Sequence, residues 1–227
     1  MQLYRHSKRI FYTSYEEERD RPALGYIKGE RFCLAVDAGH SSDHLHEFYA
    51  LLRKNDLPLP SLTILTHWHW DHSFALHAIN GLSLASRKTD ACLRDFIVKR
   101  SPASDQTFLD LDPCIRKEYP EGKPLIVTPA DIVYEDHLQI DAGDLQIQVF
   151  ESVSPHCDDA TLIYVPQEKF VFLGDSTSGP FPTYIPDPEK LKEMLPVLEN
   201  IDADHFLHAH VPLFKKADLI DQLKNSL

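Results

Sequence analysis

Apolar and polar residues alternate in short runs along much of the chain, as in β-strands with one buried face. Segment 23–37 contains successive short strands broken by a turn at 28–30, with Leu34 and Val36 on one face. The apolar run 61–66 suits a buried strand that ends at a group of histidines. These patterns predict a β-rich first half of the chain.

Strand patterns return in the second half of the chain, which suggests two similar halves. Segments 132–140 and 145–150 are predicted to form a hairpin, because apolar residues alternate with polar ones on either side of Asp141-Ala142-Gly143. Further strands are predicted at 82–85, 161–165, 170–173 and near Phe206.

Helical periodicity predicts the elements that cover these strands. Ser41 or Ser42 can cap a surface helix with Leu45, Phe48 and Leu52 on one stripe, which Pro58 and Pro60 end. Other helices are predicted at 72–79, through Cys92 to Ile97, at 187–200 and from Lys215 onward. We therefore expect two mixed β-sheets packed face to face with helices on both outer faces.

No repeat, low-complexity tract or Gly/Ser linker divides the 227 residues, so we expect one α+β domain over 1–227. Segment 90–124 has a weaker pattern and is predicted to be a helical or loop-like excursion near the candidate active site. The formal charge of −12 argues against a nucleic-acid partner.

The sequence contains no signal-peptide core and no apolar run long enough to cross a membrane. Its four cysteines are widely spaced, as reduced thiols would be. We expect a cytoplasmic protein with a small-molecule substrate and no membrane association.

The unusual chemistry lies in the segment Thr66–His72, where His67, His69, Asp71 and His72 fall within six positions. Imidazoles two residues apart on an extended or tightly turned segment can face one ion, and the next Asp and His can reach a second. Such donors suit zinc, and also iron or manganese.

This segment resembles the His-x-His-x-Asp-His signature of the metallo-β-lactamase superfamily. Other segments resemble further family motifs in the same order, namely Val36–Gly39, Ser154–His156, Phe172–Asp175 and His210-Val211-Pro212. The resemblance covers nearly the whole chain and implies a four-layer αββα sandwich.

The resemblance also implies a site for two divalent metal ions. One ion would be held by His67, His69 and His156, the other by Asp71, His72 and His210, with Asp175 bridging them. Between the ions a shared hydroxide would be the nucleophile. Asp71 would also orient this nucleophile or accept its proton, and Asp37 is a candidate to position one ligand imidazole.

Two departures from the family pattern leave details open. The third-histidine segment is Ser-Pro-His-Cys-Asp-Asp in place of the frequent Gly-His-Thr-Pro-Gly, so the subfamily is undetermined. His208 is an alternative last ligand, although His210 before Val-Pro fits the resemblance better.

Roles other than metal binding are expected for the remaining aromatic, cysteine, aspartate and histidine side chains of interest. Trp68 and Trp70 are expected to pack and stiffen the loop or to face substrate, Cys157 to be a small packed residue, and Tyr184 to be an ordinary loop aromatic or a donor to substrate. Asp158 and Asp159 are expected in turns or caps. No metal role is expected for His6, His40, His44, His46, His77, His137 and His205, and solvation is expected for His44 and His46.

The predicted function is a metal-dependent hydrolase of a small ester, thioester, lactone, amide or phosphodiester. The alternative is an iron-dependent thiol or sulfur oxygenase of the same superfamily. The net negative charge argues against a nuclease. The lack of an appended helical substrate-binding domain argues against a glyoxalase II. Segments 90–124 and 176–188 are the predicted pocket walls.

Overall fold

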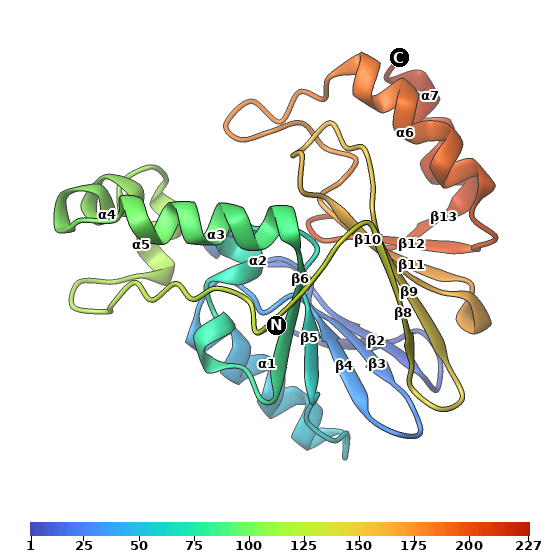
Figure 1. Ribbon diagram of the computed structural model, residues 1–227, viewed down its shortest axis with the longest axis horizontal. Coiled ribbons are helices and arrows are strands. Elements are labelled where there is room, and N and C mark those ends of the chain that lie inside the picture. The colour runs from blue at the N-terminus through green and yellow to red at the C-terminus, as the bar shows by residue number, and fades with distance from the viewer.

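Two mixed β-sheets form the centre of the computed structural model, which describes residues 1–227 (Figure 1). The first sheet has seven strands in sequence order, β1 to β7, and the second has six strands in the order β13-β12-β11-β10-β9-β8. In the first sheet, β1 to β4 are antiparallel and β4 to β7 are parallel. In the second, only β11 and β12 pair in parallel.

The first sheet contains β1 (Leu3–Arg5), β2 (Ile10–Thr13), β3 (Gly25–Lys28), β4 (Cys33–Val36), β5 (Leu62–Ile64), β6 (Leu82–Ser86) and β7 (Ile132–Tyr134). The second contains β8 (His137–Asp141), β9 (Gln146–Glu151), β10 (Thr161–Val165), β11 (Phe170–Gly174), β12 (His205–His208) and β13 (Phe214–Lys215).

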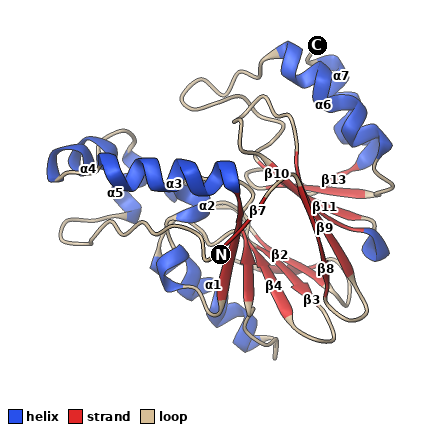
Figure 2. Cartoon of the chain, in the orientation of Figure 1, coloured by secondary structure: helices blue, strands red, loops and turns tan.

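Helices lie on both outer sides of the paired sheets (Figure 2). The α-helices are α1 (Ser42–Lys54), α2 (Trp70–Ser73), α3 (Arg87–Lys99), α4 (Pro102–Leu109), α5 (Pro113–Glu118), α6 (Pro188–Asn200) and α7 (Lys216–Asn225). Single turns of 3-10 helix occur at η1 (Glu17–Arg19), η2 (Leu76–Ala78) and η3 (Pro166–Glu168). None of the helices combines the length and hydropathy that a membrane crossing requires.

Buried side chains form three apolar layers, which is what a four-layer sandwich requires. Leu34 and Val36 of β4 point into the layer between the sheets, where they meet Phe170 and Phe172 of β11. The alternate residues of each strand face outward, so Ala35 packs against the helices of the first sheet. The opposite face of β11 packs against α6 and α7. The predicted αββα sandwich is therefore confirmed.

The predicted strand 132–140 is wrong, because the chain changes sheets within it. Residues 132–134 pair in parallel with β6 in the first sheet, whereas 137–141 form the predicted hairpin with β9 in the second. The change of direction occurs at Asp136, which has a left-handed backbone with φ of 59°. Aspartate tolerates this conformation better than most residues.

The predicted helix 72–79 is also wrong in its extent. The structure has α2 followed by η2, because the backbone N–H of Ala75 bonds the carbonyl of Gly39 at 3.1 Å in place of a helical partner. Ser41 is the cap of α1, where its hydroxyl accepts from the backbone N–H of His44. Contrary to prediction, His44 is fully buried, while His46 is exposed.

Candidate metal centre

The predicted ligands lie on loops and on the short helix α2 at one edge of the sandwich. Asp37 follows β4 and the segment 67–72 follows β5, and these two strands are parallel neighbours. Asp175 follows β11 and His210 follows its parallel neighbour β12, while His156 lies between β9 and β10. Since parallel strands end at the same sheet edge, each sheet brings its loops to a common crevice.

One group of donors is the three-histidine cluster, formed by His67, His69 and His156. Nδ1 of His69 lies 3.1 Å from Nε2 of His67 and 2.9 Å from Nε2 of His156. Nδ1 of His156 donates to the carbonyl of Gly179 at 2.9 Å, which leaves its Nε2 facing the cluster. Three imidazole nitrogens thus converge on one point.

The second group is the mixed cluster, formed by Asp71, His72, Asp175 and His210. Oδ2 of Asp71 lies 3.2 Å from Nε2 of His72 and 3.0 Å from Nε2 of His210. Oδ2 of Asp175 lies 3.4 Å from Nε2 of His210 and 3.8 Å from Nε2 of His156. Asp175 therefore lies between the two clusters.

Two histidines of the three-histidine cluster, His67 and His69, are held neutral by burial. Burial and the neighbouring imidazoles depress the pKa of His67 well below its usual value, and they lower the pKa of His69 to about 4. A neutral imidazole is the form that binds a metal ion.

In the mixed cluster, by contrast, the carboxylates favour the protonated, positively charged form of the histidines. Burial disfavours the charged form of His72 and His210, but the adjacent carboxylates outweigh burial and raise the pKa of His210 to about 9 and that of His72 well above its usual value. The same attraction overcomes burial in Asp71 and Asp175, whose pKa values lie well below the usual range. The buried carboxylates therefore require a positive charge beside them.

The side chains present fit a divalent metal centre. Nε2 of His72 and Oδ1 of Asp175 are buried and make no hydrogen bond, although buried polar atoms are almost always paired. Each cluster offers donor atoms within 4.8 Å of one another. Imidazole and carboxylate donors in these combinations are typical of zinc and related ions.

Asp37 holds one imidazole of the mixed cluster in place, as the sequence suggested. Its Oδ2 lies 2.8 Å from Nδ1 of His72, and its Oδ1 accepts from the backbone N–H of Thr66 at 2.7 Å. Because Nδ1 of His72 donates to this carboxylate, Nε2 is directed toward Asp71 and Asp175.

The structure brings His210, and not His208, into the mixed cluster. Nε2 of His208 lies 2.9 Å from the hydroxyl of Ser178, and its Nδ1 accepts from the backbone N–H of His210 at 3.1 Å. Burial lowers the pKa of His208 to about 4. His208 thus supports the loop that carries His210.

The remaining residues singled out in the sequence lie around these clusters. Asp159 accepts from the backbone N–H of Trp68 at 2.8 Å and from the hydroxyl of Thr89 at 3.0 Å, so it fixes the histidine loop. Burial raises the pKa of the Cys157 thiol, so a thiolate is disfavoured there. Asp158 is exposed and pairs with Lys190.

A cavity of about 290 Å³ covers the two clusters. Its aromatic walls are Trp70, Phe181 and Tyr184, so the predicted wall 176–188 is present. Segment 90–124 contributes no side chain to this cavity, and that prediction is wrong. Instead, Phe108 of α4 packs behind Trp70, with ring centroids 5.7 Å apart.

Sequence reasoning missed two carboxylates of this cavity, Glu17 and Asp20. Asp20 accepts a hydrogen bond from Nε1 of Trp70 at 3.0 Å. Burial, with the nearby Asp71 carboxylate, raises its pKa to about 6. Both residues lie in the acidic turn Glu16–Asp20, which looks like a solvated surface segment and gives no signal of a site.

Comparison with known proteins identifies the fold. No family model matches the sequence, and no curated protein matches it. The structure of the metallo-β-lactamase DIM-1 is similar, with a TM-score of 0.70 and 17% identity over 99% of this chain and 95% of that one. A metallo-β-lactamase from Pontibacter korlensis has a TM-score of 0.69 and 15% identity over 99% of both chains.

The sec-alkylsulfatase Pisa1 from Pseudomonas sp. has the same fold in part of its length. Its TM-score is 0.69 at 12% identity, and the match covers 99% of this chain and 40% of that one. The chain therefore has the metallo-β-lactamase fold over nearly its whole length, as its sequence motifs predicted.

Proposed function

We propose that this chain is a hydrolase that uses two divalent metal ions, zinc by the preference of its donors, to cleave a small ester, thioester, lactone, amide or phosphodiester. The observation that supports this proposal is the convergence of the three-histidine cluster and the mixed cluster, with Asp175 between them. When bound, such ions lower the pKa of a shared water toward neutrality and polarise the bond under attack.

The chain's own residues would have distinct roles in this reaction. Asp37 holds the His72 imidazole and the Gly179 carbonyl holds that of His156, so the donor atoms are oriented before any ion arrives. Asp71, as a ligand next to the reacting water, would orient that water or accept its proton. Trp70 and Phe181 would exclude bulk water from one side of the cavity.

A cavity of this size suits a small molecule, and the proposed substrate is therefore neither a nucleic acid nor a membrane lipid surface. The metallo-β-lactamases and the alkylsulfatase with this fold are hydrolases by name, which supports a hydrolytic reaction without identifying its substrate.

The test is a panel of chromogenic ester, thioester, lactone, β-lactam, phosphodiester and alkyl sulfate substrates, run on protein of measured metal content. We expect turnover of at least one class, its loss after chelation, and its return with zinc. Asp71→Ala should lose activity, whereas Asp158→Ala, which removes an exposed carboxylate two residues after His156 in the sequence, should keep it.

Full activity in metal-free protein, or in Asp71→Ala, would refute the proposal. Stoichiometric iron together with oxygen uptake on a thiol substrate would favour the thiol or sulfur oxygenase instead.

A further inference from the structure

The cavity over the metal clusters has no lysine or arginine that could pair with an anionic substrate, and its histidines are the metal donors His69, His156 and His210 together with His208. None of its thirteen lining residues is a lysine or an arginine. Apart from the ligand carboxylates Asp71 and Asp175, it contains two more acids, Glu17 and Asp20. Sites built for carboxylate, sulfate or phosphate groups usually present arginine or lysine to them.

Asp20 is held in the cavity wall by specific contacts. Its side chain accepts from the Trp70 indole, and its backbone N–H bonds the carbonyl of Glu17 at 3.2 Å. Its backbone is left-handed, with φ of 51°, and ends the turn η1. The hydrogen bond to Trp70 and the backbone conformation therefore fix the position of the Asp20 carboxylate in the cavity wall.

A buried ion pair next to Asp20 anchors this turn. Arg21 is only 2% exposed, and its guanidinium donates to both carboxylate oxygens of Glu118 in α5, at 2.9 and 3.0 Å. The neighbouring carbonyl of Arg19 accepts from Nδ1 of His40 at 3.0 Å. These contacts bind the acidic turn to two other elements of the fold.

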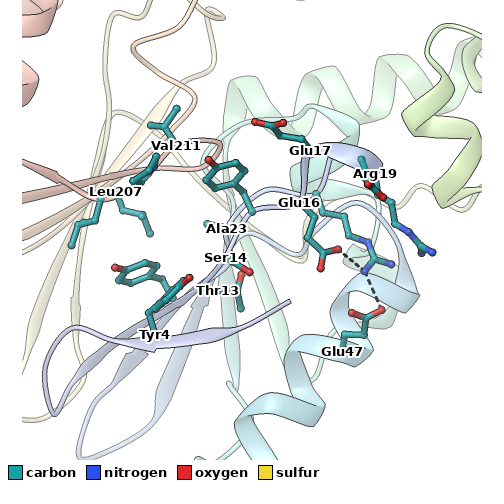
Figure 3. A pocket seen from close by; sticks show the side chains of 16 residues that line it. Tyr4, Thr13, Ser14, Glu16, Glu17, Arg19, Ala23, Glu47, Leu207 and Val211 are labelled. Atoms are coloured by element: carbon teal, nitrogen blue, oxygen red, sulfur yellow. Dashed lines mark hydrogen bonds and ion pairs between the residues drawn. The ribbon is translucent and has the colours of Figure 1, made fainter.

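Glu17 is exposed and forms no ion pair, unlike its neighbour Glu16, which pairs with Arg21. It lies where the cavity over the clusters meets a second cavity of about 920 Å³, since Glu17 and Val211 line both. Figure 3 shows this second cavity, with Glu17 apart from the ion pairs of Glu16 and Glu47. Three tyrosines, Tyr4, Tyr12 and Tyr15, are among the residues that line it.

Aromatic rings line the same cavity as these carboxylates. The ring centroids of Trp70 and Phe181 are 5.3 Å apart, and those of Phe181 and Tyr184 are 6.0 Å apart. Tyr184 is 53% exposed, so its ring is accessible. Aromatic faces next to carboxylates favour uncharged apolar groups and alkylammonium groups.

We propose that this cavity selects substrates whose group beside the scissile bond is uncharged or positively charged, and that Glu17 and Asp20 determine this selectivity. The inference rests on the proposed hydrolase function and narrows its substrate class to neutral or ammonium-bearing apolar esters and amides. With two divalent ions bound, the carboxylates of Glu17, Asp20, Asp71 and Asp175 balance the metal charge, so the site offers little net attraction to an anion.

Matched esters test the proposal on the zinc-loaded enzyme. Three esters with the same acyl group carry a trimethylammonium, a tert-butyl or a sulfonate group at the same place in the alcohol. We expect kcat/KM to fall by about tenfold to a hundredfold from the ammonium to the sulfonate ester. Glu17→Gln should reduce this ratio, and Glu17→Gln with Asp20→Asn should remove it. Glu193→Gln, an exposed position on α6, should leave the ratio unchanged.

Binding provides a readout that does not depend on turnover. Quenching of the tryptophan fluorescence should show tighter binding of benzyltrimethylammonium than of benzenesulfonate, a poor metal ligand, and Glu17→Gln should reduce the difference. Equal binding of the two probes, or an unchanged ratio in the double variant, would overturn the inference. Metal-dependent hydrolysis without charge preference would overturn only the inference. Charge-selective binding without hydrolysis of any member of the substrate panel would overturn only the proposed function.

Discussion

Replacing Asp37 with asparagine should weaken binding of the metal ion in the mixed cluster and leave binding of the ion in the three-histidine cluster unchanged. Asp37 is 1% exposed and accepts hydrogen bonds from His72 and Thr66. Loss of such a partner behind a ligand imidazole typically costs ~10–100-fold in metal affinity, or about 1.4–2.7 kcal/mol. The NH₂ group of the asparagine would also face the hydrogen-bond donors of Thr66 or His72. One buried donor would then have no acceptor, which destabilises the metal-free protein by about 1–3 kcal/mol.

The assay is a titration of metal-free protein with zinc against a competing chelator, together with urea unfolding of the metal-free form. The control is Asp131→Asn at an exposed position, because Asp131, like Asp37, accepts from a backbone N–H and from a hydroxyl, those of Ser83 at 2.8 and 2.7 Å, and none of its hydrogen bonds is to a histidine. If Asp37→Asn left the zinc affinity of the mixed cluster unchanged, the role assigned to Asp37 would be refuted. If it lowered the affinities of both clusters equally, the division into two clusters would be refuted.

Three further outcomes follow from the same geometry. His210→Gln should lose one of the two ions while His208→Gln keeps both, as measured by metal analysis after dialysis. Between pH 6 and 8, the affinity of the mixed cluster should rise with pH, because protons on His72 and His210, whose pKa values are raised, compete with the ion. The three-histidine cluster should change less in the same zinc titrations, because His67 and His69 are already neutral. Arg21→Met should lower the free energy of unfolding by about 3–5 kcal/mol in urea, since the buried Glu118 carboxylate loses both hydrogen bonds from Arg21 and keeps only the Ser41 hydroxyl and the half-exposed Arg19 at 3.7 Å. A loss below about 1 kcal/mol would contradict that role.

The layers of the fold and the convergence of the donors were predictable because their signals are local. Alternation within β4 assigns Leu34 to the space between the sheets, and the same rule holds in β9 for Ile147. The donor side chains lie in the segments that follow β5, β9, β11 and β12, and the ends of these strands are where the fold forms its crevice. Helical spacing also contains information that the prediction did not use, since His44 lies one turn before the buried Phe48.

Other features depend on contacts between distant parts of the chain. The acidic turn is held at the cavity by contacts with distant residues, among them the pair of Arg21 with Glu118, 97 residues away. The change of sheet at Asp136 interrupts an alternating pattern that continues on both sides of it. The role of α4 as a support behind Trp70, and not as a pocket wall, is likewise set by tertiary packing.

The most direct test of a dinuclear centre is anomalous X-ray diffraction at the zinc edge from crystals of the zinc-loaded protein. The account predicts two peaks about 3.5–4 Å apart. One should lie among His67, His69 and His156, and the other among Asp71, His72 and His210, with Asp175 contacting both. A single peak, or a second peak coordinated by His208, would contradict it.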